Sequence, residues 1–199
     1  MYIGGDRLSN NYIIAITGKS ASGKDSIARV LANQYNYKYV VSTTTRPMRS
    51  NEQQGINYHF ISDEEFQRLI DNNMLIEYRY YDAIENGRKK RWHYGITKDE
   101  INLDKQSAVV VVDLKGLEDL KKYFGNKIIS FYIDVPEEER RLRAMARDIK
   151  FEEEEFIRRC ADDDIRFKNV KHKVDAIIRN IDFNQCIKDI VEKCNKSNK

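Results

Sequence analysis

Residues 12–26 read YIIAITGKSASGKDS, an apolar and largely β-branched run that leads into a glycine-rich turn. The run predicts a buried strand over Tyr12–Thr17, and the amphipathic stretch Lys24–Gln34 predicts a helix directly after the turn. A strand joined to a helix in this way is the opening unit of a βαβ fold, in which crossover helices link parallel strands. We therefore expect this segment to open an α/β domain.

The alternation of apolar runs and amphipathic stretches continues along the chain and predicts a five-stranded parallel sheet with helices on both faces. The further strands are expected over Tyr37–Ser42, Ala108–Asp113, Ile128–Ile133 and Val174–Arg179. The further helices are expected over Leu114–Phe124, Glu137–Asp148, Glu153–Phe167 and Phe183–Asn195.

Residues 43–100 interrupt this pattern, because they are rich in Tyr, Asn, Arg and Gly. Short strands over Ile56–Phe60 and Leu75–Tyr81 and a helix over Asp63–Asp71 indicate an inserted lobe rather than a layer of the core. The segment 137–167 carries arginines among acidic residues at helical spacing, which fits a solvated helical hairpin or a basic flap over phosphates. We expect one domain over residues 1–199, with a core of about 12–42, 101–136 and 168–199, a lobe of about 43–100 and a lid of about 137–167.

The composition narrows the class of protein. The chain has 199 residues, 41% of them hydrophobic, and a formal net charge of +3, which gives no case for a dedicated nucleic-acid binder. The three cysteines, Cys160, Cys186 and Cys194, show no paired spacing and favour reduced thiols. No run approaches the roughly 20 apolar residues of a membrane span. We expect a cytoplasmic protein with small-molecule partners, no nucleic-acid or membrane partner, and a monomeric or weakly dimeric state.

The turn after the first strand carries the chemistry of a phosphate-binding loop. Its two glycines let the backbone curl so that successive N–H groups and the helix N-terminus point at phosphate oxygens. Lys24 can then reach the β- and γ-phosphates of ATP. A tight turn that merely needs glycine is the alternative reading. The expected ATP-binding residues in this segment are Gly18, Ser20, Ala21, Ser22, Gly23, Lys24, Asp25 and Ser26.

The residue after Lys24 differs from the usual pattern, in which a Ser or Thr hydroxyl binds magnesium. Asp25 occupies that position and Ser26 follows it. The Asp25 carboxylate is therefore expected to bind Mg²⁺, directly or through water, with Ser26 on a phosphate oxygen.

A second constellation follows in residues 42–66. It comprises STTTRPMRSNE over 42–52, GINYHF over 55–60 and DEEF over 63–66. Two guanidinium groups on a proline-stiffened turn, Arg46 and Arg49, can grip one phosphate at several points, and Tyr58 adds a neutral hydroxyl donor. Ordinary surface arginines are the alternative. With the phosphate loop, these stretches resemble the guanylate kinase family over about residues 12–182.

The resemblance implies the roles of further residues. It places Ser42, Tyr94 and Gly95 at the acceptor monophosphate, Glu77 at the Watson–Crick edge of guanine, and Asp113 near the magnesium and the acceptor nucleotide. It makes Arg141 and Arg159 lid arginines that close on the donor phosphates, and it places Asn180 near the donor adenine. The chain departs from the family pattern at Asp25, at Ile96, in the long segment Asp82–Arg91 and in the lid over Ala161–Arg166.

The reaction implied is transfer of the ATP γ-phosphoryl group to GMP or dGMP, with Lys24, Arg46, Arg141 and Arg159 as catalytic residues. Mg²⁺ is the implied cofactor, with Asp25 and Asp113 as candidate ligands that bind it directly or through water. Three alternatives stay open: a kinase for another nucleoside or deoxynucleoside monophosphate, a non-catalytic protein-binding module of the same fold, and a P-loop ATPase that drives another process.

Overall fold

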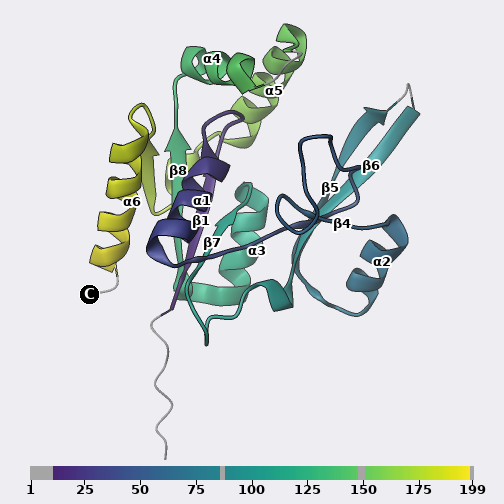
Figure 1. Cartoon of the computed structure of the whole chain (residues 1–199), viewed down its shortest axis with the longest axis horizontal. Coiled ribbons are helices and arrows are strands. Elements are labelled where there is room, and N and C mark those ends of the chain that lie inside the picture. Colours follow the sequence, from purple (N-terminus) through teal and green to yellow (C-terminus); the bar gives the residue numbers. More distant parts are fainter. Residues whose placement is uncertain (1–10, 86–87, 148–150, 198–199) are drawn as a thin grey trace, which may run out of the picture.

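The computed structural model describes residues 11–85, 88–147 and 151–197. Its centre is a sheet of parallel strands in the order β2-β7-β1-β8-β9 (Figure 1). The five-stranded parallel sheet expected from the sequence is confirmed. The strands are β1 (Ile13–Gly18), β2 (Lys38–Tyr39), β7 (Ala108–Val111), β8 (Ile128–Asp134) and β9 (Ala176–Arg179).

The two faces of this sheet pack against different helices. Along the buried β1, Ile13 and Ala15 face the cluster that includes Leu117 of α3 (Leu114–Phe124). Their neighbours Ile14 and Ile16 face the opposite cluster, under α1 (Lys24–Tyr35) and α6 (Phe183–Ser197). Because strand side chains alternate between faces, a strand that is apolar throughout must be covered on both sides.

A smaller sheet, with strand order β4-β3-β6-β5, forms the body of the inserted lobe. Its strands are β3 (Thr43–Thr44), β4 (His59–Phe60), β5 (Leu75–Glu85) and β6 (Arg88–Thr97), and α2 (Asp63–Asp71) packs beside it. Ser62 caps α2: its hydroxyl accepts from the Glu65 N–H, and the Glu65 carboxylate accepts from the Ser62 N–H. This reciprocal cap explains why α2 has the bounds that the sequence predicted.

The helices α4 (Glu137–Arg147) and α5 (Glu153–Arg166) lie over the end of the sheet where β1 runs into α1 (Figure 1). Both begin at the predicted residues; the expected end of the first, Asp148, lies outside the described residues. Short 3₁₀ turns occur at η1 (Lys98–Glu100), η2 (Gly125–Lys127) and η3 (Val170–His172). None of the helices in the described part of the chain is both long and apolar enough to cross a membrane.

Two strand predictions need correction, and one strand was missed. The run Tyr37–Ser42 pairs with the central sheet only at β2, because the chain then leaves for the lobe, where Thr43 pairs with Gly95. The expected strand Ile56–Phe60 is reduced to β4, since residues from Gly55, which has a φ of 72°, form a turn. β6 was not predicted at all, because charged residues at its start hide its alternation. It pairs antiparallel with β5 over most of its length.

Candidate active site

The phosphate loop connects β1 to α1 in a conformation that only small residues permit. Gly23 has a φ of 88°, and a Cβ there would lie 2.8 Å from the Asn180 side-chain nitrogen. Ala21 also has a positive φ, 59°. Asn180 is fully buried and donates through Nδ2 to the Ser22 carbonyl oxygen at 2.9 Å. Asn180, expected near the donor adenine, therefore braces the loop from beneath in this structure.

Polar atoms remain unsatisfied around this loop. Among the described residues, the buried hydroxyls of Thr17 and Ser22 and the Oδ1 atom of Asn180 have no hydrogen-bond partner. Since buried polar atoms are normally paired, such a group next to a curled loop fits a site for a polar ligand.

A cavity of about 490 Å³ opens beside the loop. It brings together all three parts of the molecule: Lys24 and Asp25 from the loop and α1, Tyr58 from the lobe, and Arg159 from α5. The Lys24 ammonium donates to the Lys19 carbonyl oxygen at 2.9 Å. The remaining lining residues are Ser20, Ala21, Ala144, Phe151, Glu152, Glu155 and Phe156. Ser26 lies in the exposed first turn of α1, and Gly18 ends β1.

The lid arginines are arranged differently from the expectation. Arg159 lines the cavity and pairs with Glu155 at 2.7 Å. Arg141 is exposed, and its guanidinium is paired with Glu153 of α5 at 2.7 Å, so it links the two lid helices instead of facing the cavity. The sequence analysis missed Arg140, which is fully buried and donates to the Ser20 carbonyl oxygen at 3.3 Å. Arg140 was missed because the family resemblance assigned the lid role to its neighbour Arg141.

An acidic pair of α5 also contacts the phosphate loop. Asp163 accepts a hydrogen bond from the Ser20 backbone N–H at 2.6 Å, and Asp164 forms an ion pair with Lys19. Arg140 lies 4.0 Å from Asp163. The sequence marked this segment only as a departure from the family, because nothing in it shows which loop its carboxylates meet.

The arginines of the lobe differ in burial. Arg46 is buried; it donates to the Pro47 carbonyl oxygen and to Glu52, both at 2.7 Å, and its guanidinium carbon lies 5.5 Å from the Tyr58 ring centre. Arg49 is exposed, and its backbone N–H donates to the other Glu52 oxygen at 2.9 Å. Glu52 therefore holds the turn that carries both arginines.

Two tyrosine side chains of the lobe lie at the cavity: Tyr58 lines it, and Tyr94 packs against Tyr58. Tyr94 and Gly95 lie opposite Thr44 and Thr43 in the β3–β6 ladder, and the Tyr94 ring meets Tyr58 edge-on at 5.9 Å. Burial and the negative charge of Asp25 raise the pKa of Tyr58 to about 12, so its hydroxyl stays a neutral donor. Half-buried Ser42, just before β3, accepts through its carbonyl oxygen from the His59 N–H.

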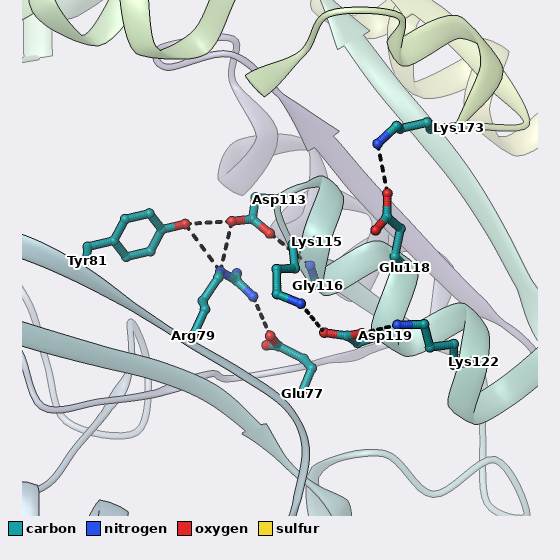
Figure 2. A network of polar contacts seen from close by, with 10 residues as sticks. All are labelled: Glu77, Arg79, Tyr81, Asp113, Lys115, Gly116, Glu118, Asp119, Lys122 and Lys173. Atoms are coloured by element: carbon teal, nitrogen blue, oxygen red, sulfur yellow. Dashed lines mark hydrogen bonds and ion pairs between the residues drawn. The ribbon is translucent and has the colours of Figure 1, made fainter. Parts of the chain in front are cut away.

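Glu77 takes part in a buried polar network at the base of the lobe (Figure 2). Its carboxylate pairs with Arg79, whose Nε lies 2.9 Å from Asp113 Oδ2. The same Asp113 oxygen accepts from the Tyr81 hydroxyl at 2.6 Å, while Oδ1 accepts from the Gly116 N–H at 2.9 Å and caps α3. Burial raises the pKa of Glu77 to about 7, against the opposing charge of Arg79. Arg79 is a second residue that the sequence analysis did not assign, although it lies two residues from Glu77, on the same face of β5.

The carboxylates offer little for a metal beyond Asp25. The described residues contain no group of three or more His, Cys, Asp or Glu placed to hold an ion. Mg²⁺ is commonly bound by one or two carboxylates together with substrate phosphates and water, so the Asp25 carboxylate, next to Lys24 on the cavity wall, fits that donor set. Both Asp113 oxygens already have protein partners.

The sequence is similar to those of known guanylate kinases. The sequence profile of the family described as guanylate kinase matches residues 10–197. A guanylate kinase of Bacteroides fragilis is 33% identical over 131 residues, which cover 62% of this chain and 59% of that protein. The guanylate kinase of Porphyromonas gingivalis is 31% identical over 184 residues, 89% of this chain and 93% of that protein. The match to the Bacteroides fragilis kinase therefore spans less than two thirds of that relative's length.

The solved structures point the same way for the fold. The match to the crystal structure of guanylate kinase from Anaplasma phagocytophilum covers 96% of this chain and 87% of that protein's chain, with a TM-score of 0.65 and 24% sequence identity. At that identity the likeness shows the fold alone. The profile match, in contrast, runs from just before β1 to the end of α6. On that match the chain belongs to the guanylate kinase family.

Proposed function

We propose that the protein transfers the γ-phosphoryl group of ATP to GMP or dGMP, giving ADP and the nucleoside diphosphate. The observation that carries this proposal is the single cavity wall shared by Lys24 of the phosphate loop, Tyr58 of the lobe and Arg159 of the lid. Transfer between two nucleotides requires that a donor site and an acceptor site open into one space.

The donor end is assigned to the phosphate loop. Its curled backbone between Gly18 and Gly23 presents N–H groups, and the N-terminus of α1 adds a partial positive charge. Lys24 is assigned to the β- and γ-phosphates of ATP, and Arg159 is assigned to the transferring γ-phosphoryl group. We leave Arg141 out of the catalytic set, because its guanidinium is held by Glu153, and we assign Arg140 to the support of the loop backbone.

The acceptor end is assigned to the lobe. Arg46, Arg49, Tyr58 and Tyr94 offer donors to one phosphate, and Glu77 offers acceptors to the two donors on the guanine edge, N1–H and the exocyclic amine. An adenine edge pairs one acceptor with one donor, so it leaves an ionised carboxylate partly unsatisfied. Such mismatches cost about 1–3 kcal/mol, enough to set a base preference.

Asp25 is the proposed contact for magnesium, directly or through water, with Ser26 beside it in the first turn of α1. When bound with ATP, the ion supplies positive charge to the β- and γ-phosphate oxygens. We do not extend the magnesium proposal to Asp113, since its oxygens already serve Tyr81, Arg79 and the cap of α3.

Phosphoryl transfer depends mainly on positioning and charge neutralisation, so these residues need no covalent nucleophile. The acceptor phosphate is already anionic. Arg46 and Tyr58 orient it, Lys24 and Arg159 balance the charge on the transferring group, and the lid helices keep water away from it. Exclusion of water limits wasteful hydrolysis of ATP.

The test is a coupled assay of ADP release with ATP, Mg²⁺ and a panel of GMP, dGMP, AMP, dAMP, CMP, UMP and dTMP, with Lys24→Ala as the blank. Turnover confined to GMP and dGMP supports the proposal. Turnover on another base overturns the acceptor assignment, and no turnover on any acceptor, with ATP binding that survives Lys24→Ala, points to a protein-binding module.

A further inference from the structure

Arg79 lies between two carboxylates that the proposed acceptor site needs. Its Nη1 contacts Glu77 and its Nε contacts Asp113, and its side chain is only 16% exposed (Figure 2). The Tyr81 hydroxyl lies 3.2 Å from the same Nε. A cation in this place offsets part of the negative charge of buried Glu77 and half-buried Asp113, whose mutual repulsion would otherwise raise the pKa of Glu77 further.

The fold makes specific room for this guanidinium at Gly116, in the first turn of α3. A Cβ on Gly116 would lie 2.6 Å from Arg79 Nη1 and 3.3 Å from Glu77 Oε2. Gly116 also donates its N–H to Asp113. The absence of a side chain at one position of α3 therefore permits the bridge between β5 and α3.

The bridge leaves the Glu77 carboxylate able to accept more hydrogen bonds. An ionised carboxylate has about four lone-pair sites, and Arg79 uses only Oε2. The remaining sites can receive two donors from a base edge, which is the pattern that guanine presents.

Loss of the Arg79 charge would change which base edge can hydrogen-bond to Glu77. Glu77 is 1% exposed at its side chain and would face Asp113 without a cation between them. A carboxyl group in that setting takes up a proton and then offers one donor and one acceptor, which is the pattern that matches the edge of adenine. The charged or titratable groups around Glu77 are Arg79 and Tyr81 on β5, Asp113 at the N-cap of α3, and Lys115 and Asp119 on α3.

We propose that Arg79 is a specificity-determining positioning residue: by bridging Glu77 and Asp113 it favours the ionised form of Glu77, holds its carboxylate in place as an acceptor and so makes the site select guanine over adenine. This inference rests on the proposed role of Glu77 in the acceptor site.

The experiment compares kcat/KM for GMP and AMP between pH 7 and pH 9 in the wild type, Arg79→Met, Arg79→Lys and Glu77→Gln. Both acceptors carry the same phosphate, so its own titration cancels in the GMP-to-AMP ratio. At pH 8, above the pKa of about 7 that Glu77 has beside Arg79, we expect Arg79→Met to lower that ratio by about tenfold or more, chiefly through a higher KM for GMP, with the KM for ATP unchanged. Glu77→Gln should do the same, because an amide also pairs one donor with one acceptor.

The pH dependence separates positioning from a merely structural role. Raising the pH to 9 should restore guanine preference in Arg79→Met, since the unbridged carboxyl then ionises, and should not restore it in Glu77→Gln, which cannot ionise. Arg79→Lys, which keeps the charge, should retain most of the preference at pH 8. Arg91→Met is the matched control, because Arg91 is exposed and pairs with Asp82 in the same hairpin.

Gly116→Ala provides a second perturbation that leaves Arg79 in the chain. Alanine favours the helix more than glycine does, so the variant should fold, which thermal denaturation would verify. The added methyl group displaces the Arg79 guanidinium, so the ratio of kcat/KM for GMP to that for AMP should fall. The inference is overturned if Glu77→Gln loses the preference for GMP but Arg79→Met shows an unchanged GMP-to-AMP ratio or a lower KM for GMP. If Glu77→Gln also keeps the preference for GMP, the acceptor site proposed above is itself wrong.

Discussion

Asp163 of the lid accepts a hydrogen bond from the Ser20 N–H of the phosphate loop at 2.6 Å. A carboxylate here occupies a backbone donor of the loop whose donors are proposed to bind phosphate, and its charge repels an incoming phosphate group. Arg140, 4.0 Å away, offsets part of that charge. In this structure the lid is thus held against the phosphate loop by a carboxylate that would compete with a phosphate group for the same N–H donor.

Removing the Asp163 charge should therefore strengthen ATP binding. We expect Asp163→Asn to lower the KM for ATP about fivefold, since a unit charge near a phosphate is worth on the order of 1 kcal/mol at a partly solvated site. Steady-state kinetics at saturating GMP would measure it. Asp164→Asn is the matched control, because Asp164 is exposed and forms an ion pair with Lys19. A higher KM for ATP in Asp163→Asn would mean that the carboxylate supports nucleotide binding.

Lys24 and Lys19 occupy the same loop but different surroundings. Lys24 lines the cavity, whereas Lys19 pairs with Asp164. We expect Lys24→Met to reduce kcat by about 10²–10³-fold, because a preorganised charge at the transferring group is lost. Lys19→Met should change kcat by about twofold or less, the scale of an exposed ion pair. Equal losses in the two variants would contradict the assignment of Lys24 to the phosphates.

Arg46 should depend on its forked shape as well as its charge. Two of its nitrogens already donate to Pro47 and Glu52, which fixes the plane of the guanidinium group that we propose to bind the acceptor phosphate. We expect Arg46→Lys to raise the KM for GMP about tenfold, since a lysine cannot keep the Glu52 contact and grip phosphate as a planar fork. The KM for ATP provides the internal control. Arg49→Lys, at an exposed side chain, should have the smaller effect, and the reverse order would show that Arg49 is the main phosphate ligand.

Asn180 should contribute to stability more than its small size suggests. Its Nδ2 satisfies the buried Ser22 carbonyl, so Asn180→Ala leaves that oxygen unpaired. We expect a loss of about 1–3 kcal/mol in the free energy of unfolding, measured by chemical denaturation. Asn184→Ala, at an exposed position of α6, should stay within about 0.5 kcal/mol of the wild type. An Asn180→Ala protein of unchanged stability but with weaker ATP binding would favour the expected contact with adenine.

Much of the fold was accessible from the sequence, because its signals are local. The apolar run of β1 and the glycines of its turn predict the strand, the loop and the helix within one short segment. The β5–β6 hairpin was predicted only in part, because residues 89–91 of β6 are charged and exposed and owe their pairing to β5, not to an apolar pattern of their own.

The candidate site divides in the same way. Lys24 and Arg46 were assigned from short motifs, whose chemistry depends on residue type and spacing, and Glu77 was assigned from the resemblance to the family. The links of Arg79 to Asp113 and of Asp163 to Ser20 join positions far apart in the chain. Which of several lid arginines faces the loop depends on the rotation of α4, which the packing of Arg140 and Arg141 against α5 fixes.

The sequence by itself thus determined the α/β class, the phosphate loop and the arginines of the lobe, because each is written in neighbouring residues whose backbone and charge requirements are met locally. Only the tertiary structure decided the partners of Glu77, Asp113 and Asp163, because the charge that each carboxylate meets comes from another element brought close by folding.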